Sequence, residues 1–182
     1  MGENQKQKYP VSRALIFPFR FWRKGQKGFS MIELLAVIFI ISLISGLIAI
    51  SYWNSQKQYS VSKAAQRLAV DLRRVQNMAL SGATQGAVAP RGYGLYVQSA
   101  GQYLLFYNAN ADTAYNDSSV SLGATALENA ALSPVGASIY FVPPAPTTFI
   151  NGVNGGSQTF VISSGGRSKS VVVDFGGKID ID

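Results

Sequence analysis

The chain has 182 residues, which is enough for one domain with appendages but too few for two full domains. Apolar residues make up 47% of the chain and the mean hydropathy is +0.13, so we expect one very apolar segment attached to an ordinary polar domain. The sequence contains neither cysteine nor histidine, which excludes disulfides, thiolate chemistry and the commonest general base. We therefore expect no enzymatic activity, no metal site and no cofactor.

The net charge of +7 is concentrated at the N-terminus. Seven of the 16 Lys and Arg residues, but one of the nine acidic residues, lie in residues 1–28. Cations that flank an apolar run on one side mark the cytoplasmic side of a membrane span. The basic charge is therefore a signal of membrane topology, and we expect no nucleic-acid partner.

The apolar run extends from Phe29 to Trp53 and contains a single charged side chain, Glu33. As a helix it would measure roughly 37 Å, enough to cross a hydrocarbon core of about 30 Å. Aromatic residues at its far end, Tyr52 and Trp53, suit a membrane interface. The sequence predicts a single span, with everything after it outside the cytoplasm.

Three interpretations of this span compete. A cleaved secretory signal would use the small residues around Ala49-Ile50-Ser51, but such apolar regions are shorter, about 7–15 residues. A plain signal anchor that tethers an exterior domain is the second interpretation. Neither explains Glu33, because an ionisable residue in a membrane segment is costly and usually functional.

The segment Lys27-Gly28-Phe29-Ser30-Met31-Ile32-Glu33-Leu34-Leu35 resembles the processing site of type IV prepilins and type II secretion pseudopilins. The resemblance implies that a prepilin peptidase cuts between Gly28 and Phe29 and methylates the new N-terminus at Phe29. It also implies that Glu33 neutralises the ammonium group of a neighbouring subunit. Such a buried pair fixes register more than it adds stability, since an unpaired buried charge costs several kcal/mol.

Apolar periodicity continues beyond the span and predicts an amphipathic helix that ends near Gly82. Its seam has spacings of three and four residues: Val61, Ala65, Leu68, Leu72, Val75 and Ala79. The opposite face is polar and we interpret it as solvated: Lys57, Lys63, Arg67, Arg73, Arg74 and Gln76. We expect one helix over 29–80 whose second half packs on the following domain; an independent coiled coil is the alternative.

After Gly82 the sequence alternates short β-rich runs with Gly, Pro, Asn and Ser clusters. We expect five or six strands, which include a hairpin over 93–108. Further strands are expected at 138–142, 159–163 and 170–175, with Gly-Gly turns of the two-residue type after the last two.

The predicted fold class is α+β, a long N-terminal helix packed on a small antiparallel β-rich domain, as in pilins. The predicted organisation comprises a basic leader that is cleaved (1–28), the membrane half of the helix (29–53), its amphipathic half (54–82) and an extracytoplasmic β domain (83–182). The exterior domain weakly resembles the H-type minor pseudopilins in its helix end, its hairpin over 94–107 and its closing Val-Val-Val-Asp-Phe-Gly-Gly-Lys strand pair.

Three further motifs in the exterior domain were considered as binding sites. Asn108-x-Asn110-x-Asp112 faintly resembles a calcium loop, yet an ordinary Asn/Asp loop is favoured because most EF-hand positions are missing. The stretch over 165–170 resembles a phosphate loop with the wrong spacing, so we interpret it as a solvated turn. Aromatic pairs could stack nucleobases, but core packing is favoured: Tyr93, Tyr96, Tyr103, Phe106 and Tyr107.

The sequence therefore predicts a non-enzymatic structural subunit, a minor pilin or pseudopilin, of a type IV pilus or type II secretion filament. It would sit in the inner membrane with its C-terminal domain outside, and later join an extracytoplasmic filament. The implied partners are the prepilin peptidase, other pilin subunits, an inner-membrane assembly platform with its ATPase, and membrane lipid before assembly. The alternative is a single-pass, membrane-anchored β domain that acts alone as a binding or sensor module.

Overall fold

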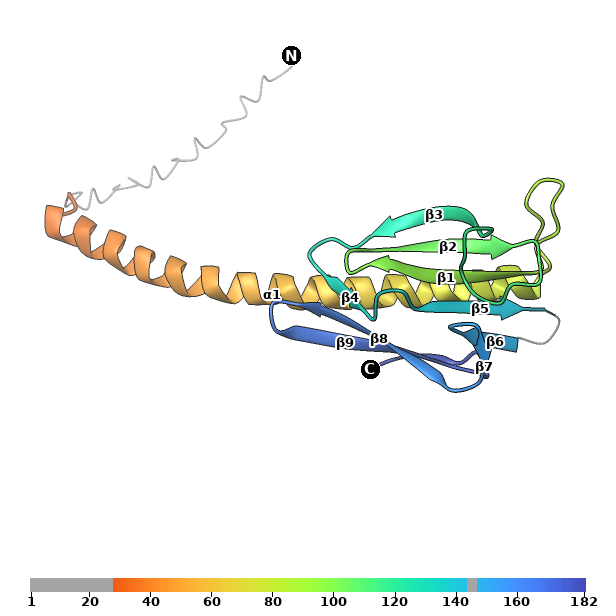
Figure 1. Cartoon of the computed structure of the whole chain (residues 1–182). Helices are drawn as coiled ribbons and strands as arrows, with labels where there is room; N and C mark the ends of the chain where they lie inside the picture. The colour runs from red at the N-terminus through yellow and green to blue at the C-terminus, as the bar shows by residue number, and fades with distance from the viewer. Residues whose placement is uncertain (1–27, 144–146) are drawn as a thin grey trace, which may run out of the picture. The chain divides into compact units, whose positions relative to one another are not determined.

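The computed structural model describes residues 28–143 and 147–182, without the side chains of residues 49–51. One long helix, α1 (Met31–Leu80), precedes ten strands in this part of the chain (Figure 1). By contacts the chain falls into two units, one up to Leu43 and one from Ile44 to Asp182. The α+β class with antiparallel sheets is confirmed.

The first turn of α1 is fixed by Ser30. Its side-chain oxygen and its carbonyl both accept a hydrogen bond from the amide of Glu33, at 3.2 and 3.1 Å. This is the N-cap arrangement, which satisfies an amide that has no partner within the helix. The helix therefore begins at Met31 and not at Phe29 as predicted, because the capping residue itself lies outside it.

The C-terminus of α1 is closed by Gly82, as predicted. The amide of Gly82 donates to the carbonyl of Ala79 at 3.2 Å, and that of Ala83 donates to Met78 at 3.1 Å. These two bonds form a Schellman motif, which requires a left-handed residue, and Gly82 has φ +59°. The chain then turns back along the helix toward the first strand.

The first sheet has six antiparallel strands in the order β3-β2-β1-β5-β6-β7. Its centre is the hairpin of β1 and β2, in which Tyr93 faces Tyr107 and Leu95 faces Leu105. The predicted hairpin is thus confirmed. The strands of the first sheet are β1 (Gly92–Ser99), β2 (Gln102–Asn108), β3 (Val120–Ala126), β5 (Ser138–Val142), β6 (Thr147–Ile150) and β7 (Val153–Asn154).

The second sheet has four antiparallel strands in the order β10-β9-β8-β4. Its strands are β4 (Ala131–Ser133), β8 (Ser157–Ser164), β9 (Arg167–Asp174) and β10 (Ile179–Ile181). Between β8 and β9 only Gly165 and Gly166 lie outside the ladder, with φ +52° and +81°, so this turn has the predicted two-residue form. The connection after β9 is longer than predicted, because Val173 already pairs with Ile179.

The main core lies between the second half of α1 and both sheets (Figure 1). Every seam residue predicted on the helix is buried, and Leu68, Leu72 and Val75 are completely inaccessible. They pack with apolar side chains from the sheets: Leu95, Val97, Ile139, Phe141, Phe160, Ile162, Val171 and Val173. Burial against a domain, and not a coiled coil, therefore accounts for the periodicity of this half of the helix.

A smaller cluster lies on the other face of the first sheet. Leu104, Phe106 and Tyr140 are buried there, and Tyr115 from the β2–β3 connection covers them. The ring of Tyr115 meets that of Phe106 edge-on at 5.3 Å between centroids. The long connection after β2 is thereby held against the sheet.

The prediction of five or six strands is wrong, since the described residues contain ten. The missed strands are β3, β4, β6 and β7. Of these, β3 is rich in Ser, Gly, Ala and Thr and mostly exposed, so it lacks the apolar alternation that marks a strand. The others have two to four residues and are defined by the strands beside them.

Candidate functional site

The predicted cleavage junction lies at the start of the described part of the chain. Gly28, Phe29 and Ser30 are irregular in conformation and precede the first turn of α1. Apart from the immediate chain neighbours, no described residue has an atom within 4 Å of the position that a Cβ would occupy at Gly28, and Phe29 is 78% exposed. Among the described residues, nothing therefore crowds the Gly28 side of the predicted junction. The leader that precedes it, residues 1–27, lies outside the described residues.

Glu33 lies in the first turn of α1 and is exposed. A carboxylate in this position interacts favourably with the positive end of the helix dipole. Ser30-Met31-Ile32-Glu33 also has the S-x-x-E spacing of a capping box, a helix-start signature that the sequence prediction overlooked. The position of Glu33 therefore has a local structural explanation beside the predicted role in register.

The helix that follows exposes its apolar side chains over residues 31–48. Met31, Ile32, Phe39 and Leu47 are each more than 60% exposed. Its most apolar window of 18 residues has a mean hydropathy of 2.8 with no residue buried. Among the described residues this is the one helix that is long and apolar enough to cross a membrane. Such a surface in water would be unfavourable, which supports membrane anchoring.

The polar face of the second half of α1 is only partly solvated. Arg73 donates to the carbonyl of Ile179 at 3.3 Å, and Gln76 donates to that of Gly177 at 2.9 Å. Both acceptors belong to β10 or the turn before it, so these two side chains attach the last strand to the helix. Arg73 nevertheless stays exposed, so the prediction of a solvated face is wrong only for Gln76, which is half-buried.

A buried hydrogen bond joins the helix to the first sheet. The hydroxyl of Tyr103, a residue with no exposed surface, donates to Asp71 Oδ2 at 2.7 Å. Burial, followed by the neighbouring carboxylate of Asp71, raises the pKa of Tyr103 far above its usual range. Asp71 thus attaches the sheet to the helix, a role that no sequence motif indicated.

The loop after β2 is stabilised by its own polar side chains. Asp112 Oδ2 accepts hydrogen bonds from the amides of Asn110 and Asn116 and from the hydroxyl of Ser118. These bonds, that of Asn116 first, lower the pKa of the Asp112 carboxyl. Within residues 28–143 and 147–182, no three His, Cys, Asp or Glu side chains gather in a metal-binding group. The observed hydrogen bonds are those of the ordinary Asn/Asp loop that the sequence favoured.

The aromatic residues of the first sheet pack internally, as predicted. Tyr93, Tyr103 and Phe106 are buried, and the hydroxyl of Tyr93 donates to the carbonyl of Ala83 at 2.7 Å. Tyr96 stacks on Tyr115 with ring centroids 4.2 Å apart. These rings are engaged within the domain and do not form an open platform for bases.

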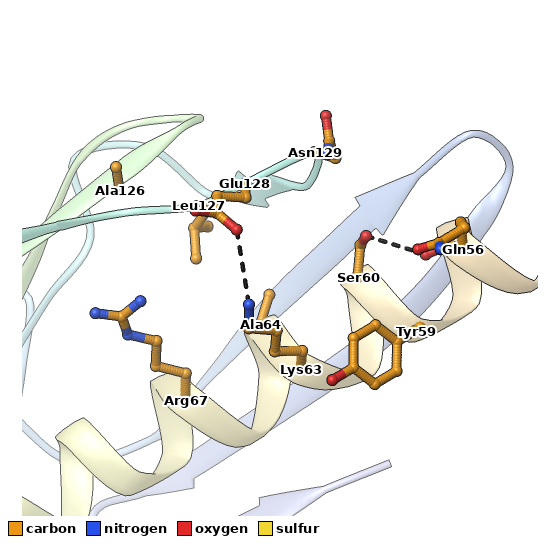
Figure 2. A pocket seen from close by; sticks show the side chains of 10 residues that line it. All are labelled: Gln56, Tyr59, Ser60, Lys63, Ala64, Arg67, Ala126, Leu127, Glu128 and Asn129. Atoms are coloured by element: carbon orange, nitrogen blue, oxygen red, sulfur yellow. Dashed lines mark hydrogen bonds and ion pairs between the residues drawn. The ribbon is translucent and has the colours of Figure 1, made fainter.

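A groove of about 230 Å³ lies between α1 and the connection from β3 to β4. Figure 2 shows Lys63 and Arg67 of the helix facing Glu128, with Lys63 Nζ 3.6 Å from its carboxylate. The hydroxyl of Ser60 donates to the carbonyl of Gln56 one turn earlier. The groove is thus lined by charged side chains of both signs, Lys63, Arg67 and Glu128.

Comparison with known proteins yields one match. Residues 23–49 match the family model of the prokaryotic N-terminal methylation motif. No curated protein and no solved structure matches the chain. The match covers the predicted junction, Glu33 and most of the apolar span, whereas the predicted likeness of the exterior domain to H-type minor pseudopilins stays a prediction.

Proposed function

We propose that the chain is a non-enzymatic filament subunit, a minor pilin or pseudopilin of a type IV pilus or type II secretion filament. The match of residues 23–49 to the prokaryotic N-terminal methylation motif supports this proposal. The observation that carries the proposal is the order of features at the N-terminus. An accessible Gly28–Phe29 junction precedes a methylation-type motif and an apolar helix with one early carboxylate.

In the proposed sequence of events the precursor is held in the inner membrane by the apolar half of α1, with its C-terminal domain outside the cytoplasm. The prepilin peptidase cuts after Gly28 and methylates Phe29. An assembly platform with its ATPase then draws the subunit into an extracytoplasmic filament. Identical helices that stack head to tail form a heterologous contact, and such contacts generate open fibres.

Glu33 carries the predicted role in register. When α1 stacks beside the helix of another subunit, its carboxylate neutralises the ammonium group at the neighbouring Phe29. Removing one partner of a buried pair costs about 3–5 kcal/mol, because the other charge is left uncompensated. Replacement of Glu33 would therefore reduce assembly without preventing cleavage.

The first test is mass spectrometry of the intact protein and its N-terminal peptide, after extraction from native membranes. We expect a mature chain that begins at Phe29 and carries one added methyl group. A chain that still begins at Met1 would support the alternative of a lone membrane-anchored domain. One that begins at Tyr52 would indicate a cleaved secretory signal instead.

A second test separates the two explanations of Glu33. Glu33→Gln removes the charge needed for register, while Ser30→Ala removes the cap and keeps that charge. Loss of the cap costs about 1 kcal/mol of helix stability, so we expect Ser30→Ala to assemble nearly normally and Glu33→Gln to fail. Equal defects in filament incorporation would show that Glu33 acts only at the helix start.

A further inference from the structure

Three exposed cationic residues belong to the β8–β9 hairpin and to the part of α1 that its turn contacts. Lys57 belongs to the helix, and Arg167 and Lys169 belong to β9; all three are exposed. The approach is close, because a Cβ built at Gly165 would lie 2.5 Å from Cδ of Lys57. Gly165 at the turn thus allows the hairpin tip to lie directly against the aliphatic stem of Lys57.

The pairing of β8 with β9 places both hairpin cations on the side of the helix. Lys169 lies opposite Ile162, whose side chain is buried in the main core. Arg167 lies opposite Ser164, two residues farther along the same face. Side chains directly opposite each other in a ladder share one face, so Arg167 and Lys169 extend the core-facing side of the hairpin beyond its last buried residue.

The positive charge of this corner is not neutralised within the domain. Lys57, Arg167 and Lys169 form no ion pair with any of the residues that the structure describes. Glu128, the acid on the neighbouring connection, is paired with Lys63. Asp182 pairs through its backbone with Ser170, and Ser170 lies opposite the exposed Val161. Asp182 is therefore on the face of the sheet that points away from Arg167 and Lys169.

The corner also lies at the end of the apolar run. Tyr52 and Trp53 are 59% and 70% exposed and have the amphipathic character of interfacial residues. Lys57 follows Trp53 by one turn of helix, about 6 Å along its axis. A hollow of about 400 Å³ joins the two regions and is lined by Trp53, Lys57 and Ser164, among others.

We propose that Lys57, Arg167 and Lys169 form a docking surface for the phosphate headgroups of anionic lipids. The inference rests on the proposed membrane-held precursor, in which Tyr52 and Trp53 mark the lipid–water boundary. Each Lys or Arg close to an anionic bilayer surface binds it favourably, and the contributions of three such residues add. Together they should shift the ratio of docked to undocked domain on the order of 100-fold. Docking holds the β domain against the bilayer until the subunit leaves the membrane, when these cations become available to the filament.

The absence of cysteine provides a direct test on the full-length chain. Ser168→Cys places one label site on the exposed side of the hairpin tip, and Val153→Cys places one at the β7 edge of the other sheet as a control. Each labelled chain is reconstituted in nanodiscs of phosphatidylcholine, with or without about one third phosphatidylglycerol. Fluorescence of the label is then measured with a quencher attached to the lipid headgroup.

We expect the label at Ser168 to be quenched several-fold more in the anionic bilayer, and the label at Val153 to be unaffected. The triple variant Lys57→Gln, Arg167→Gln and Lys169→Gln should lose this difference. A control with the same loss of charge should keep it: Arg74→Gln, Arg91→Gln and Lys178→Gln. Equal quenching in the two bilayers, or a difference that survives the first triple variant, overturns the proposal.

The same samples separate this inference from the proposed function. Flotation of the nanodiscs and protease protection report whether the chain inserts with a single span. A chain that does not insert contradicts both proposals. A chain that inserts and is cut by prepilin peptidase after Gly28, but whose hairpin label is not quenched, contradicts the docking surface alone.

Discussion

The hydrogen bond between Tyr103 and Asp71 offers a quantitative test of how the sheet is attached to the helix. The substitution Tyr103→Phe removes the hydroxyl and keeps the ring, which has no exposed surface. Two partners then lose their bond, the Asp71 carboxylate at 2.7 Å and the hydroxyl of Thr125. Packing in the core is otherwise unchanged.

The expected loss follows from the charge and exposure of the acceptor. A hydrogen bond to a charged group contributes about 1.5–3 kcal/mol to stability. Asp71 is only partly buried, so water replaces some of the lost interaction and the effect falls in the lower half of that range. We expect Tyr103→Phe to lower the free energy of unfolding by about 1.5–2 kcal/mol.

The assay is chemical unfolding of the full-length chain in detergent micelles, followed by near-UV circular dichroism. A double-mutant cycle with Asp71→Ala isolates the coupling between the two side chains. We expect a coupling energy above about 1 kcal/mol, since each single variant removes the same bond. A loss below about 0.5 kcal/mol, or a coupling near zero, would refute the idea that this bond attaches the sheet to the helix.

Three further predictions concern the fold. Gly94→Ala should lower the free energy of unfolding by about 3 kcal/mol, because the new Cβ would lie 2.5 Å from the carbonyl oxygen of Ile139 and 2.6 Å from the ring of Phe106. Gly101→Ala is the control: its Cβ would meet open space, so the same denaturation assay should show almost no change. Gly82→Ala should lower the free energy of unfolding by about 1 kcal/mol, since the Schellman motif needs a residue with left-handed φ at this position. Hydrogen exchange should then show reduced protection of the backbone amides near residue 80. Burial raises the pKa of Tyr140 to about 12, whereas the unfolded chain titrates near 10. The folded state therefore holds more protons between these values, and the contribution of Tyr140 to the free energy of unfolding should fall by about 2–3 kcal/mol as pH rises through this window. Burial also raises the pKa of Tyr103, which adds to the total fall, so the share of Tyr140 is the difference between the unchanged chain and Tyr140→Phe.

The features that the sequence predicted correctly are local or periodic. The seam from Val61 to Ala79 repeats at helical spacing, and Gly82 provides a left-handed C-cap, so both follow from neighbouring residues. The β1–β2 hairpin was predicted because its two apolar strands are joined by a short turn. The N-terminal methylation motif also lies within one short stretch of the chain, residues 23–49, so it could be recognised without knowledge of the fold.

The start of the helix at Ser30 is also encoded in neighbouring residues, but it was not predicted. The spacing Ser30-x-x-Glu33 is itself a helix-start signature, and its use would have placed the first helical residue at Met31.

The remaining features depend on contacts between residues far apart in the chain. Asp71 meets Tyr103, and Arg73 meets the carbonyl of Ile179, only after the helix has packed against the sheets. The edge strand β3 has no apolar alternation of its own and exists because β2 supplies a partner. Likewise, Lys57 lies beside Gly165 only because the β8–β9 turn comes close to the helix. Hydropathy, charge and spacing along the chain thus predicted the apolar span, the methylation-type motif at its start and the face of the helix that is buried. The tertiary structure alone decided which polar groups lie together, since pairing across long separations is selected by packing and register and not by neighbouring residues.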